Sequence, residues 1–201
     1  MKSKALLVTL LFVALACSTP KSVAPVSFPL QYKMVATAAE FPTLTSCAGV
    51  SSVVVEDARD NKTIGRRSIE GNATATADVT TTTSVTDWVQ KGIEDALKRA
   101  GATTGKAGAP TLRVRVQEIR TIENVLHRAG YEGYVTLAGE LVPAGGGASC
   151  WKGTAEGKGE NYGYPGSAEN YNETLNHALD RAIIRMLGSS DFKSAACNCG
   201  G

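Results

Sequence analysis

The sequence predicts an α+β fold: a two-layer sandwich in which two amphipathic helices pack on one face of a mixed or antiparallel sheet. Several segments alternate apolar and polar residues, which is typical of strands with one buried face. Two longer segments repeat apolar residues every three or four positions, which is typical of helices with one buried side. Strands, helix, three strands and helix follow one another, and such elements bury their apolar faces by stacking in two layers.

The first half of the domain is expected to contribute two strands and a helix. Residues 52–57 include three consecutive valines and suit a buried strand, and the Ala-, Thr- and Val-rich segment 72–83 is expected to pair with it. The residues between these strands have turn chemistry up to Gly65. A helix is expected over 84–100, because Ser84 can cap its start and Gly101 can end it.

The second half is expected to form a meander and a closing helix. Strands are predicted at 112–117, 135–141 and 151–158 from their alternating patterns, with residues 120–131 as a connector. The last helix is predicted over about 169–187, with Asn170 and Glu173 as cap partners at its start.

The first 16 residues are typical of a secretory signal peptide. Lys2 and Lys4 precede an apolar run over 5–15 that is shorter than the ~20 residues a bilayer span needs. The run ends in Val13-Ala14-Leu15-Ala16-Cys17, which resembles the lipobox of bacterial lipoproteins, where the cysteine is acylated and becomes the new amino terminus. We therefore expect lipid on Cys17.

A second interpretation of the same residues stays open. The lipobox prefers leucine three residues before the cysteine, where this chain has Ala14. Ala14-Leu15-Ala16 also forms an A-x-A site for soluble secretion. The alternative is therefore a soluble periplasmic ligand-binding protein cleaved after Ala16.

The remaining chain divides into a tether, a domain and a tail. Residues 17–45 are expected to form a lipidated, flexible tether, because residues 18–22 are mostly small and polar and Pro25 and Pro29 follow. Ser18 resembles the outer-membrane sorting pattern, so the domain is expected to face the periplasm from the outer membrane. One α+β domain is expected over 46–192, followed by a Cys/Gly-rich tail over 193–201.

Charge argues against nucleic-acid binding. The chain has 21 Lys and Arg; without Lys2 and Lys4 of the leader, 19 remain, which equals the 19 Asp and Glu. A nearly neutral mature chain has no basic field for phosphate groups.

The five cysteines can be divided between lipid and disulfides. Lipid on Cys17 leaves four for an oxidising compartment, namely Cys47, Cys150, Cys197 and Cys199. A bridge between Cys197 and Cys199 would be strained, because one residue separates them. Each is therefore expected to pair with Cys47 or Cys150, and which pairs with which stays open. The alternative is unpaired thiols in a frayed tail.

The order of these pieces resembles the YajG-like family of bacterial lipoproteins over roughly residues 49–192. The shared pieces are the leader ending at Cys17, Asp57-Ala58-Arg59, Lys62-Thr63-Ile64-Gly65-Arg66, Lys98-Arg99-Ala100-Gly101, Leu112-Arg113-Val114-Arg115-Val116, Leu175-Asn176 and Ala178-Leu179. The resemblance implies an envelope lipoprotein without known catalytic residues. The other four cysteines are not part of the resemblance.

The sequence offers no catalytic or metal-ligand pattern. His127 and His177 have no His or Cys neighbour at ligand spacing, and there is no G-x-S-x-G nucleophile motif. We therefore expect a non-catalytic binding or structural role, with no cofactor and no metal.

Two sets of side chains are candidate binding groups. Tyr162 and Tyr164 follow a glycine-rich segment and could stack on a sugar or peptide, or could simply pack against the sheet. A polar patch could be formed by Asp57, Arg59, Lys62 and Arg66, which could equally be a solvated hairpin end. The expected partners are the membrane, through the lipid anchor, and an envelope protein or glycan, but no nucleic acid.

Overall fold

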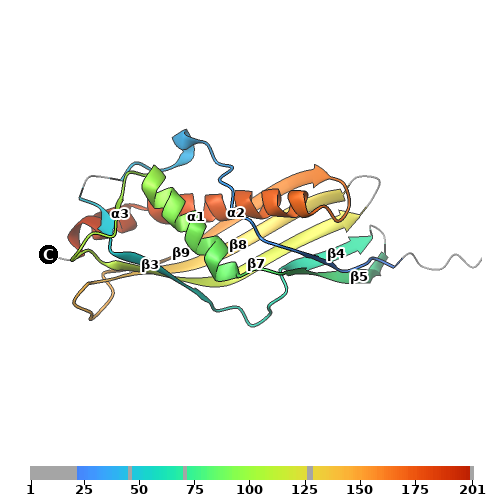
Figure 1. Cartoon of the computed structure of the whole chain (residues 1–201), viewed down its shortest axis with the longest axis horizontal. Helices are drawn as coiled ribbons and strands as arrows, with labels where there is room; N and C mark the ends of the chain where they lie inside the picture. Colours follow the sequence, from blue (N-terminus) through green and yellow to red (C-terminus); the bar gives the residue numbers. More distant parts are fainter. Residues whose placement is uncertain (1–21, 45–46, 70–71, 126–128, 200–201) are drawn as a thin grey trace, which may run out of the picture.

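The computed structural model describes residues 22–44, 47–69, 72–125 and 129–199 (Figure 1). The leader, Cys17 and His127 lie outside the described residues. The chain forms one mixed sheet whose strand order is β1 (Val26–Phe28), β5 (Asn72–Thr81), β4 (Gly65–Ile69), β7 (Thr111–Val125), β8 (Ala129–Val142) and β9 (Trp151–Gly163). A seventh strand, β3 (Ser52–Asp57), pairs with the first part of β7. Two short strands, β2 (Gly49–Val50) and β6 (Thr103–Thr104), pair separately.

Helices cover one face of this sheet. Helix α1 (Val85–Arg99) crosses α2 (Ala168–Gly188) obliquely (Figure 1), and a third helix, α3 (Ser190–Asn198), follows α2. A short 3-10 helix, Ala38–Glu40, lies in the amino-terminal segment. The predicted α+β sandwich with a mixed sheet and two amphipathic helices on one face is therefore confirmed.

Residues buried under the helices follow the alternation of β7 and β8. On β7, Leu112, Val114 and Val116 are buried. A register shift between Val116 and Glu118 then changes the phase, so that the next buried residues are at the odd positions from Ile119 onward. This β-bulge allows one strand of 15 residues to keep a buried face along its whole length.

Helix α1 begins at its predicted cap, and α2 begins at Ala168, one residue before the predicted start. The Ser84 hydroxyl accepts a hydrogen bond from Asp87 N at 3.1 Å, which is the predicted cap. The cap of α2 is Ser167, which accepts from Asn170 N at 3.3 Å, and not the predicted pair of Asn170 and Glu173.

Three predictions about the strands were wrong. The segment 72–83 pairs with β4 and β1 and not with β3, because Gly65–Ile69, expected as part of a turn, is itself a strand. The expected connector over 120–131 is mostly strand, since β7 extends to Val125 and β8 starts at Ala129. The third strand of the meander, expected to end at 158, continues to Gly163.

Most of the expected tether belongs to the fold from Val26 onward. Phe28, Leu30, Phe41 and Leu44 are buried against the helices and sheet. Asp180 of α2 accepts hydrogen bonds at 2.8 Å from both Val35 N and Ala36 N. This part of the chain is therefore a strap, residues 24–44, that is fixed to α2 by polar side chains.

The carboxyl-terminal segment is also ordered. Instead of a loose tail, residues 190–198 form α3, whose Phe192 ring meets Trp151 edge-on with centroids 5.0 Å apart. Two disulfides, Cys47–Cys197 and Cys150–Cys199, have Cα–Cα distances of 5.0 and 5.8 Å. This is one of the two connectivities that the sequence left open.

Candidate functional site

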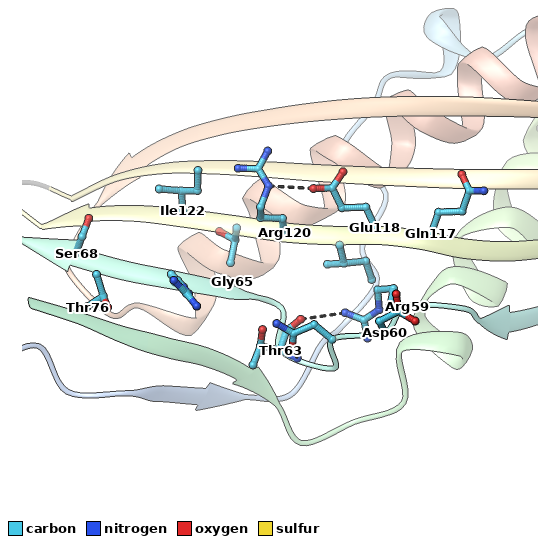
Figure 2. A pocket seen from close by; sticks show the side chains of 14 residues that line it. Arg59, Asp60, Thr63, Gly65, Ser68, Thr76, Gln117, Glu118, Arg120 and Ile122 are labelled. Carbon is cyan, nitrogen blue, oxygen red and sulfur yellow. Dashed lines mark hydrogen bonds and ion pairs between the residues drawn. The ribbon is translucent and has the colours of Figure 1, made fainter. Parts of the chain in front are cut away.

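A groove of about 780 Å³ opens on the sheet face opposite the helices, where the chain leaves β3 for β4 (Figure 2). It lies beside the bulge of β7, and β4 forms its other wall. Its lining includes four residues of the loop between β3 and β4, namely Arg59, Asp60, Asn61 and Thr63. Most of the remaining lining comes from outward-facing side chains of β4 and β7, including Arg66, Ser68, Glu118, Arg120 and Ile122.

Asp57 and Arg59 close the loop at the mouth of this groove. The Arg59 guanidinium donates to both carboxylate oxygens of Asp57, at 2.8 and 2.9 Å, and to the Thr63 carbonyl at 3.2 Å. Hydrogen bonding from Arg59 lowers the pKa of Asp57 to about 2. Lys62 adds an ion pair to the same carboxylate at 3.3 Å. These three residues of the predicted patch come together, but their charged groups pair with one another.

Besides Arg59, two further cations line the groove, Arg66 and Arg120. Arg66 is largely exposed, and its ion pair with the exposed Asp78 is long, at 4.0 Å between Nε and Oδ1. Arg120 donates to Glu118 at 2.9 Å, and its guanidinium lies 4.2 Å from the centre of the Tyr134 ring. The hydroxyl groups of Ser68 and Thr76 lie near each other in the same lining (Figure 2). The groove can therefore hold a polar ligand with an anionic group through guanidinium and hydroxyl donors.

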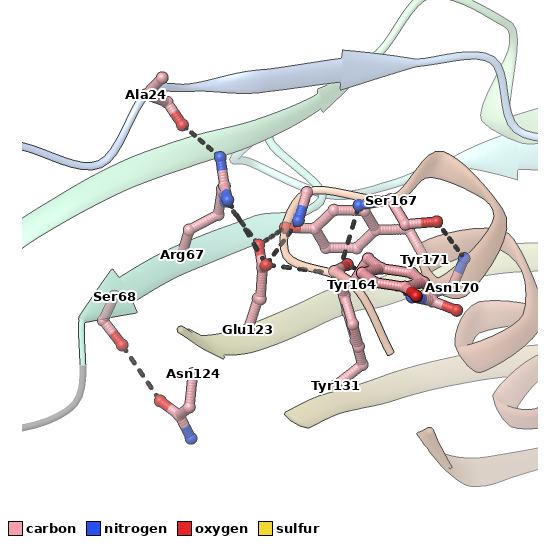
Figure 3. Close-up of polar contacts among 11 residues, drawn as sticks. Ala24, Arg67, Ser68, Glu123, Asn124, Tyr131, Tyr164, Ser167, Asn170 and Tyr171 are labelled. Atoms are coloured by element: carbon pink, nitrogen blue, oxygen red, sulfur yellow. Dashed lines mark hydrogen bonds and ion pairs between the residues drawn. The ribbon is translucent and has the colours of Figure 1, made fainter. Parts of the chain in front are cut away.

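A second polar cluster lies on the other face of the same strands and is buried. Glu123 of β7 is fully buried and pairs with Arg67 of β4 at 2.5 Å (Figure 3). The Glu123 carboxylate also accepts from the Tyr171 hydroxyl and, at 2.7 Å, from Gly166 N. Burial, and then the hydrogen bond to Glu123, raises the pKa of Tyr171. Arg67, Glu123, Tyr171 and their contacts are called the clamp below.

The clamp joins the strap to the turn between β9 and α2. Arg67 donates to the carbonyl of Ala24 at 2.7 Å. On the other side, the Tyr131 hydroxyl donates to the carbonyl of Tyr164, two residues before Gly166 (Figure 3). Sequence reasoning missed the clamp because Arg67 and Glu123 lie 56 residues apart, and only the registry of β4 with β7 brings them together.

Tyr162 and Tyr164 lie at this end of the molecule with their rings in solvent. Their exposed fractions are 75% and 86%, so the alternative in which they pack against the sheet is wrong. The glycines before them are explained by the helix above, because a Cβ on Gly157 would lie 1.9 Å from the carbonyl oxygen of Ala178. Tyr162 lies on β9 and Tyr164 just after it, whereas Arg59 and Lys62 lie in the loop between β3 and β4. The two predicted binding sets therefore do not form one site.

The described residues contain neither a metal-binding cluster nor a membrane-spanning helix. Over 22–44, 47–69, 72–125 and 129–199, no group of three His, Cys, Asp or Glu side chains could hold a metal ion. Within the same ranges, no helix has the length and apolar character needed to cross a membrane. Of the two histidines, His177 lies half-buried on α2.

Comparison with known proteins supports the fold alone. No family model matches the sequence, and no curated protein matches it either. Among solved structures, the chain is similar to a Xanthomonas campestris protein that is assigned to family DUF330, with a TM-score of 0.51 and 9% sequence identity. The match covers 85% of this chain and 96% of the Xanthomonas chain.

Proposed function

We propose that this chain is an envelope lipoprotein of the YajG-like type, anchored in the outer membrane through lipid on Cys17. Its domain faces the periplasm and binds an envelope protein or glycan without catalysing a reaction. The similarity to the DUF330 fold is compatible with this proposal but is too distant in sequence to carry it.

The observation that carries the proposal is the use of the cysteines. Two disulfides take Cys47, Cys150, Cys197 and Cys199, and disulfides persist in oxidising compartments outside the cytosol. The fifth cysteine is Cys17, directly after the apolar leader. Acylation of Cys17 gives this remaining thiol a role, and two or more acyl chains would hold the protein stably at a membrane.

The anchor is tested by metabolic labelling with an alkyne-bearing palmitate in a bacterial host. The wild-type chain is expected to carry the label and Cys17→Ala to lose it. Ala14→Leu improves the match to the lipobox and is the matched control, which should be labelled at least as strongly as the wild type. Mass spectrometry of the mature amino terminus separates the alternative: an unmodified chain beginning at Cys17 would mean soluble secretion after Ala16.

Binding in the groove is tested by photo-cross-linking in cells. A benzophenone amino acid replaces Ser68 inside the groove, and the control replaces Thr154, which lies exposed on β9 away from the groove. We expect an adduct only from position 68, and we expect Arg66→Glu to weaken it because it reverses a largely exposed charge in the groove. Equal adducts from both positions, or none from position 68, would contradict a role for the groove.

A further inference from the structure

The exposed tyrosines and the start of the strap lie at the same end of the molecule. Among the described residues, Tyr162, Tyr164 and Val54 are the large apolar side chains with high exposure, and the two tyrosines are only two positions apart. Tyr164 accepts from Tyr131 through its carbonyl, and Gly166 donates to Glu123, so the backbone of this turn is fixed. The rings themselves are exposed to solvent.

Ala24 is held within the same clamp. Its carbonyl accepts from Arg67, whose guanidinium also pairs with Glu123 and lies 3.2 Å from the position of a Cβ on Gly166 (Figure 3). A single side chain, that of Arg67, therefore connects Ala24 to the turn that carries Tyr164.

The length of chain before Ala24 limits how far this end can lie from the anchor. Cys17 is seven residues before Ala24. Even fully extended, seven residues span no more than ~25 Å. The opposite end of the sheet, at the hairpin between β8 and β9, is a further ~45 Å away, because β8 has 14 residues at ~3.4 Å each.

We propose that the turn carrying Tyr162 and Tyr164 rests on the phospholipid surface as a second, non-covalent membrane contact. This inference rests on the proposed anchor at Cys17. Tyrosine suits the boundary between headgroups and acyl chains, because its ring is apolar and its hydroxyl remains hydrated. The described charges nearest in sequence, Glu160 and Glu169, are acidic and exposed, so the contact is aromatic and does not depend on anionic lipid.

The test supplies the anchor chemically, so that it does not depend on lipidation in a cell. The mature chain from Cys17 is coupled through that thiol to a maleimide lipid in phosphatidylcholine vesicles, since the other four cysteines are paired. Tyr164→Trp is the reporter, and Ala148→Trp, exposed in the hairpin at the opposite end, is the matched control. Quenching of tryptophan emission is compared between vesicles with and without dibrominated acyl chains. The background of Trp88 and Trp151, which are buried, is subtracted using the wild type.

We expect at least twofold stronger quenching for Tyr164→Trp than for Ala148→Trp, and the same result for Tyr162→Trp as a second reporter. Replacing a third of the lipid by phosphatidylglycerol should leave this ratio unchanged. Equal quenching at the two ends would overturn the proposal and leave the tyrosines available to a protein or glycan. Quenching that appears only with phosphatidylglycerol would also overturn it, because the contact would then be electrostatic. Neither result bears on acylation of Cys17, which palmitate labelling measures separately.

Discussion

The two ends of the sheet are held together by different chemistry. At the end where β8 turns into β9, covalent bonds join α3 to the rest of the chain through Cys47–Cys197 and Cys150–Cys199. At the other end, the strap, β4, β7 and the start of α2 meet at the buried Arg67–Glu123 pair. A disulfide acts mainly on the unfolded chain, whereas a buried ion pair matters through what is left behind when one partner is removed.

Removing the disulfides should have the largest effect. Cys47–Cys197 closes a loop of 150 residues and Cys150–Cys199 a loop of 49. The chain-entropy model then assigns about 5 kcal/mol to the first and about 4 kcal/mol to the second. Cys47→Ser with Cys197→Ser, followed by Cys150→Ser with Cys199→Ser, should lower the free energy of unfolding in that order in urea titrations followed by tryptophan fluorescence. If removing neither disulfide changed the urea midpoint, the disulfides would not be what stabilises this end of the sheet.

Breaking the clamp should come next. Arg67→Met leaves the fully buried Glu123 without its cation, and such a loss costs about 3 to 5 kcal/mol. Arg66→Met is the matched control, because Arg66 is the neighbouring arginine on the exposed face and its distant pair with Asp78 contributes little. The urea midpoint should fall sharply for Arg67→Met and hardly move for Arg66→Met. Similar shifts for the two variants would show that the clamp adds no more than a surface pair.

The same comparison explains what could be predicted from the sequence. Helix α1 could be predicted because its cap, apolar stripe and terminal glycine are all local. The cysteine partners could be narrowed to two connectivities, because the close spacing of Cys197 and Cys199 excludes the third.

The clamp and the strap could not be predicted, because their signals are not local. Gly65–Ile69 contains two arginines and no alternation of apolar residues, and Arg67 is stable inside only because Glu123 lies opposite it on β7. The strap has widely spaced apolar residues without a period. Its contacts are made by Asn172, Asn176 and Asp180, which share one side of α2 at four-residue steps. A polar stripe of this kind beside an apolar one is the signal that could have identified the strap.

Removing a single hydroxyl group from the clamp should have a smaller effect than removing Arg67. Tyr171→Phe removes the hydroxyl that donates to Glu123 while keeping the ring stacked on Phe28, with centroids 5.1 Å apart. A hydrogen bond to a charged group contributes about 2 kcal/mol, so the free energy of unfolding should fall by that amount. Tyr162→Phe, at an exposed ring, should change it by less than about 0.5 kcal/mol. Equal values for both variants would mean that Arg67 and Gly166 alone satisfy the carboxylate.

Acid should lower the stability of the fold through Asp57, which lies between the two ends of the sheet. The pKa of Asp57 is about 2 in the folded chain and 3.8 in its ordinary state, so its pairing with Arg59 stabilises the fold above about pH 4. This stabilisation is lost as the pH falls from about 4 to about 2. After allowance for partial solvent screening it amounts to about 1 to 2 kcal/mol.

Asp57→Asn should therefore lower stability near neutral pH and flatten the dependence of stability on pH between about 4 and about 2. Asp78→Asn, at an exposed and distant pair, should change neither. Urea titrations at several pH values provide the measurement. If Asp57→Asn kept the full acid dependence of the wild type, the loss would have to arise at other carboxyl groups with a lowered pKa, such as Glu132 and Glu140 on β8, and not at the mouth of the groove.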